Sequence, residues 1–536
     1  MSPKQPVQIF QVVPVDVLVF MGLAFLAYLF YKRSRIHYPP GPRGIPILGN
    51  VFQLDLMQPW HSFAKWKQTF GPLVYANMAG QPIIVLNSKK VVEDLLVRRA
   101  AKYSDRYKLL VGGYMTGNLT LPFVECNERQ VELFSLWRKM RRASETALGL
   151  RNAANYHEKQ TDESVLLVHD ILKKPGDWKY HTHRQCRLAA SSSVLSMVYD
   201  LPSIQSMDHP ILAFMEDMVT RVTTAVLPGA HLVESFPILD WLPDSMARWR
   251  REAKKDFQKY STTFEELYFG IKSKRLRGME QRASFCANLA ENEARHGMSD
   301  LECAWLAGTL YGAGQETSTS TLQWFLYIML LFPAVQRRAQ EELDRVVGRS
   351  RLPSFADMKH LPYIQAIVNE ILRWKTPVPV SIPHASTKDD YYDGYFIPKG
   401  TVLFANMRSL HRDPEIYGPD ADEFRPERHL NEEGHLADPN NDGHFAYGFG
   451  LRVCVGRHVA NNFLFIAFAT ILWAMKIEPI KDAAGNEILP DTSEDFEVPI
   501  NGVVIRPRPF EFSAVTRFED AEILIAHERE EIVKKT

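Results

Sequence analysis

The sequence predicts a mainly helical protein in which long helices carry the candidate functional residues. Ser299-x-x-Glu302 matches a helix capping box, and no proline follows it before Leu331, so we expect a helix of about 32 residues there. Residues 362–376 also read as a helix, because a proline follows directly and charged residues share one face. Residues 457–468 form an apolar segment that is typical of a third helix.

Composition narrows the class of protein. The chain has 536 residues, yet no repeat or low-complexity tract divides it after its proline-rich N-terminal part. Lys and Arg total 63, as do Asp and Glu, so the chain lacks the positive excess of nucleic-acid-binding proteins and we expect no nucleic-acid partner. Its five scattered cysteines do not indicate a disulfide framework and favour a reducing compartment.

The N-terminal segment is predicted to anchor the protein in a membrane. Residues 12–31 are almost entirely apolar, and about twenty such residues suffice for one helix across a bilayer. Lys32, Arg33 and Arg35 follow, which favours a cytoplasmic position for the rest of the chain. A cleaved signal peptide is the alternative, but the start of the chain is scarcely basic and no small-residue cleavage site precedes Lys32.

We therefore divide the chain into three parts. Residues 1–31 hold the transmembrane anchor, and residues 32–50 form a basic and proline-rich hinge. Prolines restrict the backbone, so this hinge is expected to be stiff. Residues 51–536 form the remaining domain.

The predicted long helix contains an unusual glycine cluster beside two polar residues. Gly308, Gly312 and Gly314 precede Glu316 and Thr317. A glycine inside a helix costs about 1 kcal/mol relative to alanine, so three of them require a reason. Close helix packing is one reason. The other is room for a ligand and water, with Glu316 and Thr317 forming a proton path; a threonine can also bond to the carbonyl one turn back and loosen the helix.

Three other places hold candidate polar groups. Glu370 and Arg373 lie three apart among apolar residues, so the pair is expected to be partly buried and to need a further partner. Trp137 and Arg141 lie one helical turn apart and offer an indole N–H and a guanidinium, which suit a carboxylate, although such a pair is often only a surface stack. His384 fits either a carboxylate site or an ordinary loop position.

Cys454 is the strongest candidate for a metal ligand. Arg452 lies two residues earlier and a predicted helix begins shortly after, and both favour the thiolate, which is the metal-binding form. An isolated cysteine is more often a small buried apolar residue. Here, however, Gly448, Gly450 and Gly456 allow positive φ and close approach to a flat ligand. We interpret the segment as a haem-thiolate loop.

This segment resembles the ligand loop of the cytochromes P-450, the haem-thiolate monooxygenases. Their pattern is Phe-x-x-Gly-x-Arg-x-Cys-x-Gly, and every fixed position matches except the first, where Tyr447 replaces phenylalanine and adds a hydroxyl that needs a partner or a route to solvent. Glu316 and Thr317 likewise resemble the acid-alcohol pair of that family. The resemblance extends from about residue 39 to about residue 510 and implies one large, mainly α domain with small β-sheets, the cytochrome P-450 fold, after the N-terminal transmembrane helix.

The resemblance also implies a role for each candidate residue. Cys454 would be the axial ligand of haem b iron, and the haem propionates would be held by Arg452, Trp137, Arg141 and His384. On the opposite side Thr317 would position a proton donor and Glu316 would relay protons, with molecular oxygen as co-substrate. Arg428, in a segment similar to the family's Phe-x-Pro-Glu-Arg, would join Glu370 and Arg373 in a structural ion-pair network.

The activity implied is insertion of one oxygen atom into a lipophilic small molecule, for example a terpenoid or another secondary metabolite, as in fungal microsomal members. The chain has no Gly-rich dinucleotide fingerprint, so NADPH would act through a separate cytochrome P-450 reductase, with cytochrome b5 as a second donor. Basic residues in 138–142 would bind such a donor. Segments 109–123, 233–243 and 378–382, together with the long helix near Ala313, would line the substrate pocket. The expected location is the endoplasmic reticulum membrane, single-pass, with the catalytic domain cytoplasmic.

Two other classes of protein remain open. A haem-thiolate isomerase, dehydratase or peroxide-driven enzyme would not need an acid-alcohol pair, and a haem sensor or carrier would not need a proton relay. Glu316 and Thr317 therefore favour the monooxygenase. No motif identifies the substrate.

Overall fold

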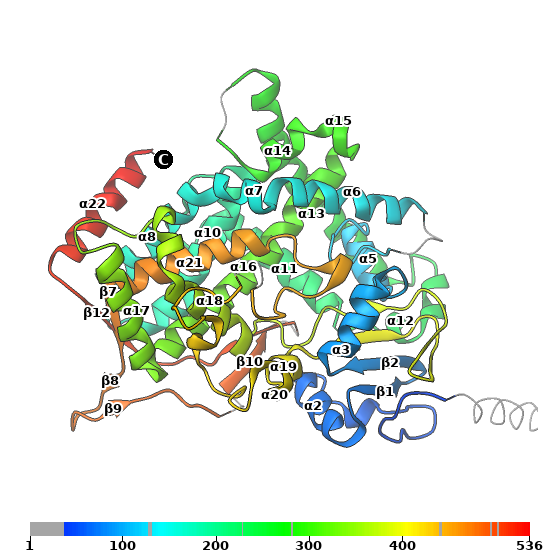
Figure 1. Cartoon of the computed structure of the whole chain (residues 1–536). Coiled ribbons are helices and arrows are strands. Elements are labelled where there is room, and N and C mark those ends of the chain that lie inside the picture. Colours follow the sequence, from blue (N-terminus) through cyan, green and yellow to red (C-terminus); the bar gives the residue numbers. More distant parts are fainter. Residues whose placement is uncertain are drawn as a thin grey trace, which may run out of the picture.

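The computed structural model describes residues 37–126, 131–227, 229–279, 282–438, 442–493, 496–500 and 503–535. Within these ranges the protein is mainly helical with small sheets, as predicted (Figure 1). The predicted anchor, residues 12–31, lies outside them. No single helix in these ranges is long and apolar enough to cross a membrane; one pair, Asp300–Leu331 with Pro333–Val346, passes the length and composition test together but is bent by 105°.

The longer helices build most of the molecule. They are α2 (Pro59–Phe70), α6 (Val131–Leu148), α8 (His157–Lys173), α10 (Cys186–Tyr199), α11 (Pro210–Ala225), α13 (Arg248–Leu276), α16 (Asp300–Leu331), α17 (Pro333–Val346), α18 (Pro362–Trp374), α21 (Arg457–Ala474) and α22 (Asp520–Lys535).

Short helices and single turns connect them. The short α-helices are α3 (Lys89–Val92), α4 (Ala100–Tyr103), α5 (Leu110–Thr116), α7 (Leu150–Ala153), α9 (Trp178–Tyr180), α12 (Leu232–Ser235), α14 (Phe285–Glu291), α15 (Glu293–His296), α19 (Met407–His411) and α20 (Pro414–Tyr417). The 3₁₀ and π turns are η1 (Val51–Gln53), η2 (Glu93–Arg98), η3 (Ala154–Tyr156), η4 (His181–Gln185), η5 (Pro237–Trp241), η6 (Phe355–His360), η7 (Pro426–His429) and η8 (Gly450–Arg452).

One four-stranded sheet has the order β1-β2-β6-β3 and lies at the lower right of Figure 1. Its strands are β1 (Leu73–Met78), β2 (Gln81–Leu86), β6 (Val402–Ala405) and β3 (His384–Ala385). Pairing is antiparallel except between β2 and β6, and His384 on the edge strand lies opposite Leu403. Two-stranded sheets join β4 (Asp390–Tyr392) to β5 (Tyr395–Ile397), β7 (Met475–Glu478) to β12 (Ser513–Thr516), β8 (Ile480–Lys481) to β9 (Glu487–Ile488), and β10 (Glu497–Ile500) to β11 (Val504–Pro507).

Helices α16 and α18, which carry candidate functional residues, begin where the sequence predicts. Ser299 and Glu302 form the capping box in both directions, and α16 runs uninterrupted for 32 residues. It is apolar around most of its circumference because α10, α13, α21 and β11 surround it. α18 begins at Pro362 as expected but ends at Trp374, two residues before the predicted end. The proline at 377 explains this, since it disfavours helical backbone in the residue before it.

The α16 glycines serve close packing rather than room for a ligand. A Cβ added at Gly308 would lie 2.5 Å from the Phe264 ring of α13, and one at Gly314 would lie 3.0 Å from Val194 of α10. Gly312 approaches Val219 of α11 in the same way, at 3.2 Å. The open position on this helix is Ala313, which is exposed although the core surrounds α16.

The C-terminal residues, which the sequence left without a role, form α22. This helix packs on α8 and α21 and buries Ala521, Ile525 and Ile532 in the core that contains α21. Before it, Arg517 forms two bonds of 2.9 Å to the Asp344 carboxylate of α17. The end of the chain is therefore part of the central core, at the left edge of Figure 1.

Candidate functional site

The Cys454 loop connects η8 to α21. The Cys454 N–H donates to the Tyr447 carbonyl at 2.8 Å, and the loop turns through positive φ at Gly448 (76°) and Gly450 (55°). A Cβ at Gly450 would lie 2.1 Å from the Leu96 carbonyl oxygen, so the residue is glycine because η2 packs closely there. Gly456 differs from the expectation: its φ is −91°, and it precedes the first residue of α21.

The Cys454 thiol is accessible although the protein packs closely around it. Its side chain is exposed, yet burial raises the pKa of the thiol, so protein atoms also lie close around it. The N–H groups of Gly456 and Arg457 and the charge of Arg141 act in the opposite direction and lower that pKa. α16 is in contact with α21, and its Ala313 is likewise exposed. Cys454, on the loop before α21, and Ala313, on α16, are thus both accessible.

Two buried guanidinium groups lie near this loop without a carboxylate partner. Arg452 donates to the carbonyls of Ser104, Leu121 and Val124 at 2.9, 3.2 and 2.7 Å. Arg106 is 7% exposed and also donates to backbone carbonyls. Across the described ranges, neither is within ion-pair distance of an acidic side chain. Burial lowers the pKa of Arg452 to about 10, and burial together with Arg452 lowers that of Arg106.

The other predicted carboxylate-binding residues surround these two arginines. The Arg452 guanidinium lies 4.8 Å from the centre of the Trp137 ring. Arg141 donates to the carbonyl of Val453, directly before Cys454, and pairs with Glu145 at 2.6 Å. The structure thus brings Trp137, Arg141 and Arg452 together beside the cysteine loop.

His384 is buried on β3, next to Arg106. Its Nδ1 lies 2.8 Å from the Tyr103 carbonyl, which can only accept, so Nδ1 carries the proton. Burial and the neighbouring Arg106 hold the pKa of His384 well below its ordinary value, so the ring is neutral. In that form Nε2 is an acceptor, and His384 would bind a carboxylate only after gaining a proton.

Glu316 and Thr317 lie on α16 within a few residues of the open position. The Thr317 hydroxyl donates to the Ala313 carbonyl at 2.9 Å, as the sequence suggested for a threonine here. Burial raises the pKa of Glu316. Its carboxylate lies 3.8 Å from Arg187 of α10, which pairs with the half-exposed Glu216 at 2.8 Å.

Glu370, Arg373 and Arg428 meet in one buried network. Two bonds of 2.7 Å join Arg373 to Glu370, and Arg428 reaches the same carboxylate at 3.0 Å. His429 adds a contact of 2.9 Å that no sequence pattern indicated. Arg373 also donates to the carbonyls of His411, Ala421 and Glu423. The network therefore joins α18 to the segment after α19.

Comparison with known proteins identifies the family. The family model described as cytochrome P-450 matches residues 39–512. The chain belongs to the cytochrome P-450 family.

Relatives of this P-450 match it over nearly their whole length. A cytochrome P-450 monooxygenase of Armillaria gallica is 45% identical over 526 residues, covering 97% of this chain and 98% of that protein. Cytochrome P-450 monooxygenase 58 of Postia placenta is 41% identical over 510 residues, with 94% of each chain covered. Cytochrome P-450 monooxygenase iboC of Amanita muscaria is 38% identical over 560 residues, covering 96% and 97%. The protein is accordingly a haem-thiolate monooxygenase that uses molecular oxygen.

The buried charges of this P-450 fit haem. Haem carries two carboxylates, and the site offers the guanidinium groups of Arg106 and Arg452, whose partners among the described residues are backbone carbonyls and, for Arg452, the Trp137 ring. Burial raises the pKa of the Cys454 thiol and so disfavours the thiolate. A bound iron would act in the opposite direction and favour the thiolate.

Sequence reasoning missed Arg106 and Arg187. Arg106 lies in a connecting segment with no recognised pattern, and its carbonyl partners come from residues 122, 382 and 383. Arg187 is separated from Glu316 by more than a hundred residues of sequence. Only the fold brings these groups to the site.

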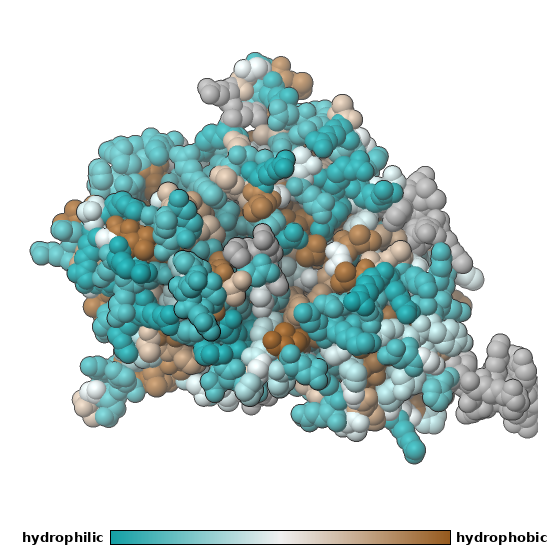
Figure 2. Space-filling model, in the orientation of Figure 1, coloured by the Kyte–Doolittle hydropathy of each residue, from teal (hydrophilic) through white to brown (hydrophobic). Residues whose placement is uncertain are grey.

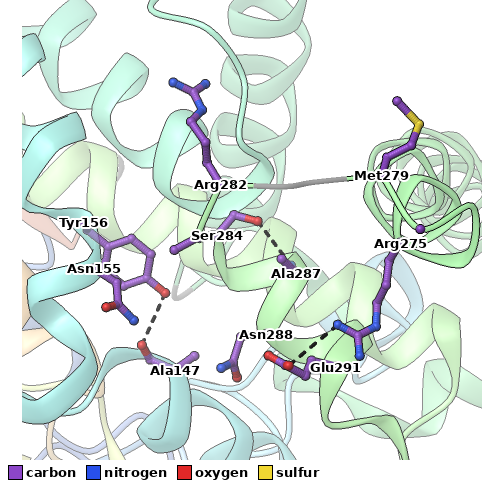
Figure 3. Close-up of a pocket in the computed structure, with 12 residues that line it drawn as sticks. Ala147, Asn155, Tyr156, Arg275, Met279, Arg282, Ser284, Ala287, Asn288 and Glu291 are labelled. Carbon is purple, nitrogen blue, oxygen red and sulfur yellow. Dashed lines mark hydrogen bonds and ion pairs between the residues drawn. The ribbon is translucent and has the colours of Figure 1, made fainter.

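A cavity of about 600 Å³ lies away from these groups, where α13, α14 and η3 meet (Figure 3). Tyr156, Arg275, Asn288 and Glu291 are among its lining residues, and Arg275 points toward Glu291 at 3.8 Å. None of the candidate site residues lines it. We therefore do not assign it to the substrate of this P-450.

Proposed function

We propose that this P-450 oxidises a lipophilic small molecule, for example a terpenoid or another secondary metabolite, with electrons from a separate NADPH-dependent reductase. The observation that carries the proposal is the accessible Cys454 thiol, around which the protein packs closely, together with the exposed Ala313 on α16. Such closely packed surroundings favour an apolar ligand. A small cavity of about 20 Å³ between α5 and α11 is lined by Leu109 and Phe123, which belong to the expected wall segment 109–123, and by Val222, which lies outside the expected segments.

Haem would supply oxygen activation, with Cys454 as its iron ligand and Arg452, Arg106, Trp137, Arg141 and His384 beside its propionates. The remaining steps belong to the protein. Because burial raises the pKa of Glu316, its carboxyl holds a proton more readily near neutral pH than an exposed one would. Thr317 donates to a backbone carbonyl, which leaves its oxygen free to accept from a water or another donor.

Arg187 and Glu216 provide a connection from Glu316 to solvent. Arg187 lies between the two carboxylates, and the Glu216 side chain is 48% exposed. We propose that Glu316 exchanges protons with solvent on this side and that Thr317 holds the proton donor on the substrate side. This would separate the proton supply from the substrate entry.

The proposed setting is the endoplasmic reticulum membrane, with the N-terminal segment as a single anchor and the catalytic domain cytoplasmic. Figure 2 shows a mostly hydrophilic face on which apolar residues form small scattered patches. Exposed apolar side chains occur on α12 and η5, including Phe236 (59% exposed) and Trp241 (85% exposed), and aromatic residues of this kind favour a membrane interface. Exposed Arg138 and Arg142 on α6 suit an acidic electron donor, the reductase or cytochrome b5.

Reconstitution tests this proposal. Full-length protein is combined with NADPH and a cytochrome P-450 reductase, and terpenoids, steroids, fatty acids and aromatics are screened for a substrate-induced change in the iron spin state. Binding compounds are then turned over under ¹⁸O₂. We expect NADPH-dependent products that carry one labelled oxygen. Turnover with peroxide but not with NADPH and reductase would favour the peroxide-driven alternative.

The ligand assignment has its own test. Cys454→Ala should lose the thiolate spectrum of the reduced, carbon-monoxide-bound protein, because the variant lacks the proposed thiolate ligand. Cys186→Ala, a change at a buried cysteine of α10, is the matched control and should keep the spectrum. Survival of the spectrum in Cys454→Ala would show that the assignment is wrong.

A further inference from the structure

Tyr447 departs from the family pattern, and its hydroxyl has a specific partner. The hydroxyl donates to Oδ1 of Asn461 at 2.5 Å. Asn461 lies near the start of α21, and its Nδ2 donates to the Asp442 carboxylate at 2.9 Å. A carboxylate only accepts, so this second bond fixes which end of the Asn461 amide faces Tyr447. The three side chains form one directed hydrogen-bond chain.

The backbone of the same tyrosine holds the cysteine. The Cys454 N–H donates to the Tyr447 carbonyl at 2.8 Å. Tyr447 therefore contacts Cys454 through its backbone and α21 through its side chain. Between Tyr447 and Cys454 the chain turns through two positive-φ glycines, Gly448 and Gly450, which tolerate more conformations than other residues and so need an external constraint.

We propose that the Tyr447 hydroxyl is a positioning group for Cys454: through Asn461, oriented by Asp442, it fixes the ligand loop to α21 and so sets the direction of the Cys454 sulfur. A phenylalanine would fill the same volume beside His444, whose ring centre lies 5.3 Å away, but would lack the hydrogen bond to Asn461 of α21. The proposal builds on Cys454 as the iron ligand. The first measurement, however, reports the mobility of the loop and does not depend on the iron ligand.

The first measurement is hydrogen exchange of the Cys454 amide in the full-length, haem-loaded protein, resolved by fragmentation mass spectrometry. Tyr447→Phe should speed this exchange by about tenfold, because a buried hydrogen bond that holds the acceptor carbonyl in place is lost. Tyr156→Phe is the control, since that hydroxyl is also buried and bonds to the Ala147 carbonyl at 3.2 Å, outside the loop. Equal exchange in Tyr447→Phe and in the unchanged protein would overturn the proposal.

The second measurement tests whether the hydroxyl acts through Asn461. Asn461→Leu, which is close to isosteric, should speed the Cys454 amide exchange as much as Tyr447→Phe does. In the double variant, the Cys454 amide should exchange no faster than in either single variant, since both substitutions remove the same interaction. Additive effects would show that the two residues act independently. If Tyr447→Phe folds poorly, Asn461→Leu still tests the proposal, because it removes the same hydrogen bond and leaves Tyr447 in place.

The third measurement concerns the ligand itself. Tyr447→Phe should lose haem to an excess of an apo-globin acceptor several-fold faster and should show a smaller thiolate-bound fraction in the reduced, carbon-monoxide-bound spectrum. Exchange of the α22 amides should stay unchanged, which separates loop mobility from general unfolding. If Cys454→Ala loses the thiolate spectrum while Tyr447→Phe alters none of these readouts, the ligand assignment stands and only the role of Tyr447 fails.

Discussion

Glu370 and Glu163 are both buried carboxyl groups, yet their surroundings move their pKa values in opposite directions. For Glu370, burial raises the pKa, but the hydrogen bonds from Arg373 and His429 outweigh it and lower the value to about 2. For Glu163 on α8, burial raises the pKa to about 8, and the Ser192 hydroxyl at 2.6 Å offsets little of this. Glu370 is therefore charged at neutral pH and Glu163 is protonated.

Glu163 predicts a pH dependence of stability. The pKa of Glu163 in the folded protein, about 8, lies above its ordinary value of 4.5, so the protonated carboxyl favours the folded state. This favourable contribution to the free energy of unfolding is fully present below pH 4.5 and is lost as the pH rises through 8. Glu163→Gln stays neutral throughout. Relative to the unchanged protein, this variant should therefore gain stability between pH 5 and pH 9, by up to about 5 kcal/mol.

Urea unfolding across that pH range measures the difference. Asp162, whose pKa burial raises to about 6, titrates in both proteins, so the comparison removes its effect. A difference that does not change with pH would show that Glu163 is charged in the folded protein.

The proposed role of Thr317 predicts how efficiently NADPH oxidation is coupled to product formation. Thr317→Ala removes the hydroxyl that would hold a proton donor, so product formed per NADPH consumed should fall by about tenfold or more. Thr317→Ser keeps the hydroxyl and should retain most of the coupling. The measurement is the ratio of product to NADPH oxidised in the reconstituted system. Unchanged coupling in Thr317→Ala would remove this residue from the proton path.

At the scale of elements, α16 combines two tasks on different faces. Its glycines allow α10, α11 and α13 to approach closely, while Ala313 borders open space. A continuous helix can do both because residues three or four apart share a face and their neighbours do not. The glycine cluster is thus a packing feature, and Glu316 and Thr317 remain the candidates for chemistry.

Two glycines of α16 give a matched pair of variants. Gly308→Ala would place a Cβ 2.5 Å from the Phe264 ring, whereas Gly312→Ala would lie 3.2 Å from the end of a valine side chain that can shift. We expect Gly308→Ala to destabilise the protein by about 1–3 kcal/mol, because overpacking exceeds the gain in helix propensity. Gly312→Ala should be close to neutral. Thermal unfolding compares them, and similar values would argue against close packing at Gly308.

At the scale of the whole molecule, one core contains α16, α18, α21 and α22. Phe325 of α16 stacks on Phe468 of α21 at 3.9 Å, and Ile525 of α22 is buried in the same cluster. The helix that follows Cys454 is therefore supported both by the central helix and by the end of the chain. Loss of either support should weaken the ligand loop.

α22 offers a second matched pair. Ile525 is 1% exposed and Ile523 is 63% exposed on the same helix. Ile525→Ala should cost about 2–5 kcal/mol, as for other buried isoleucines, while Ile523→Ala should change stability by less than about 0.5 kcal/mol. Chemical unfolding measures both. If Ile525→Ala were also neutral, α22 would not be part of the core.

Sequence patterns predicted the parts of this molecule that local chemistry determines. The capping box at Ser299 predicted the start of α16, and proline predicted both limits of α18 to within two residues. Patterns did not find Arg106 or His429, because each gains its role from partners distant in the chain. They also could not decide between the two explanations of the α16 glycines, which depends on the residues of other helices that pack there.

The position of Ala313 has a consequence for the divergence of this enzyme. Gly308 cannot gain a Cβ without moving the Phe264 ring, but Ala313 is exposed and can vary in size without disturbing this packing. Substitutions there would change the accessible surface of α16 at little cost to folding. A change of residue at this position would therefore alter what fits beside α16 while the scaffold stays constant.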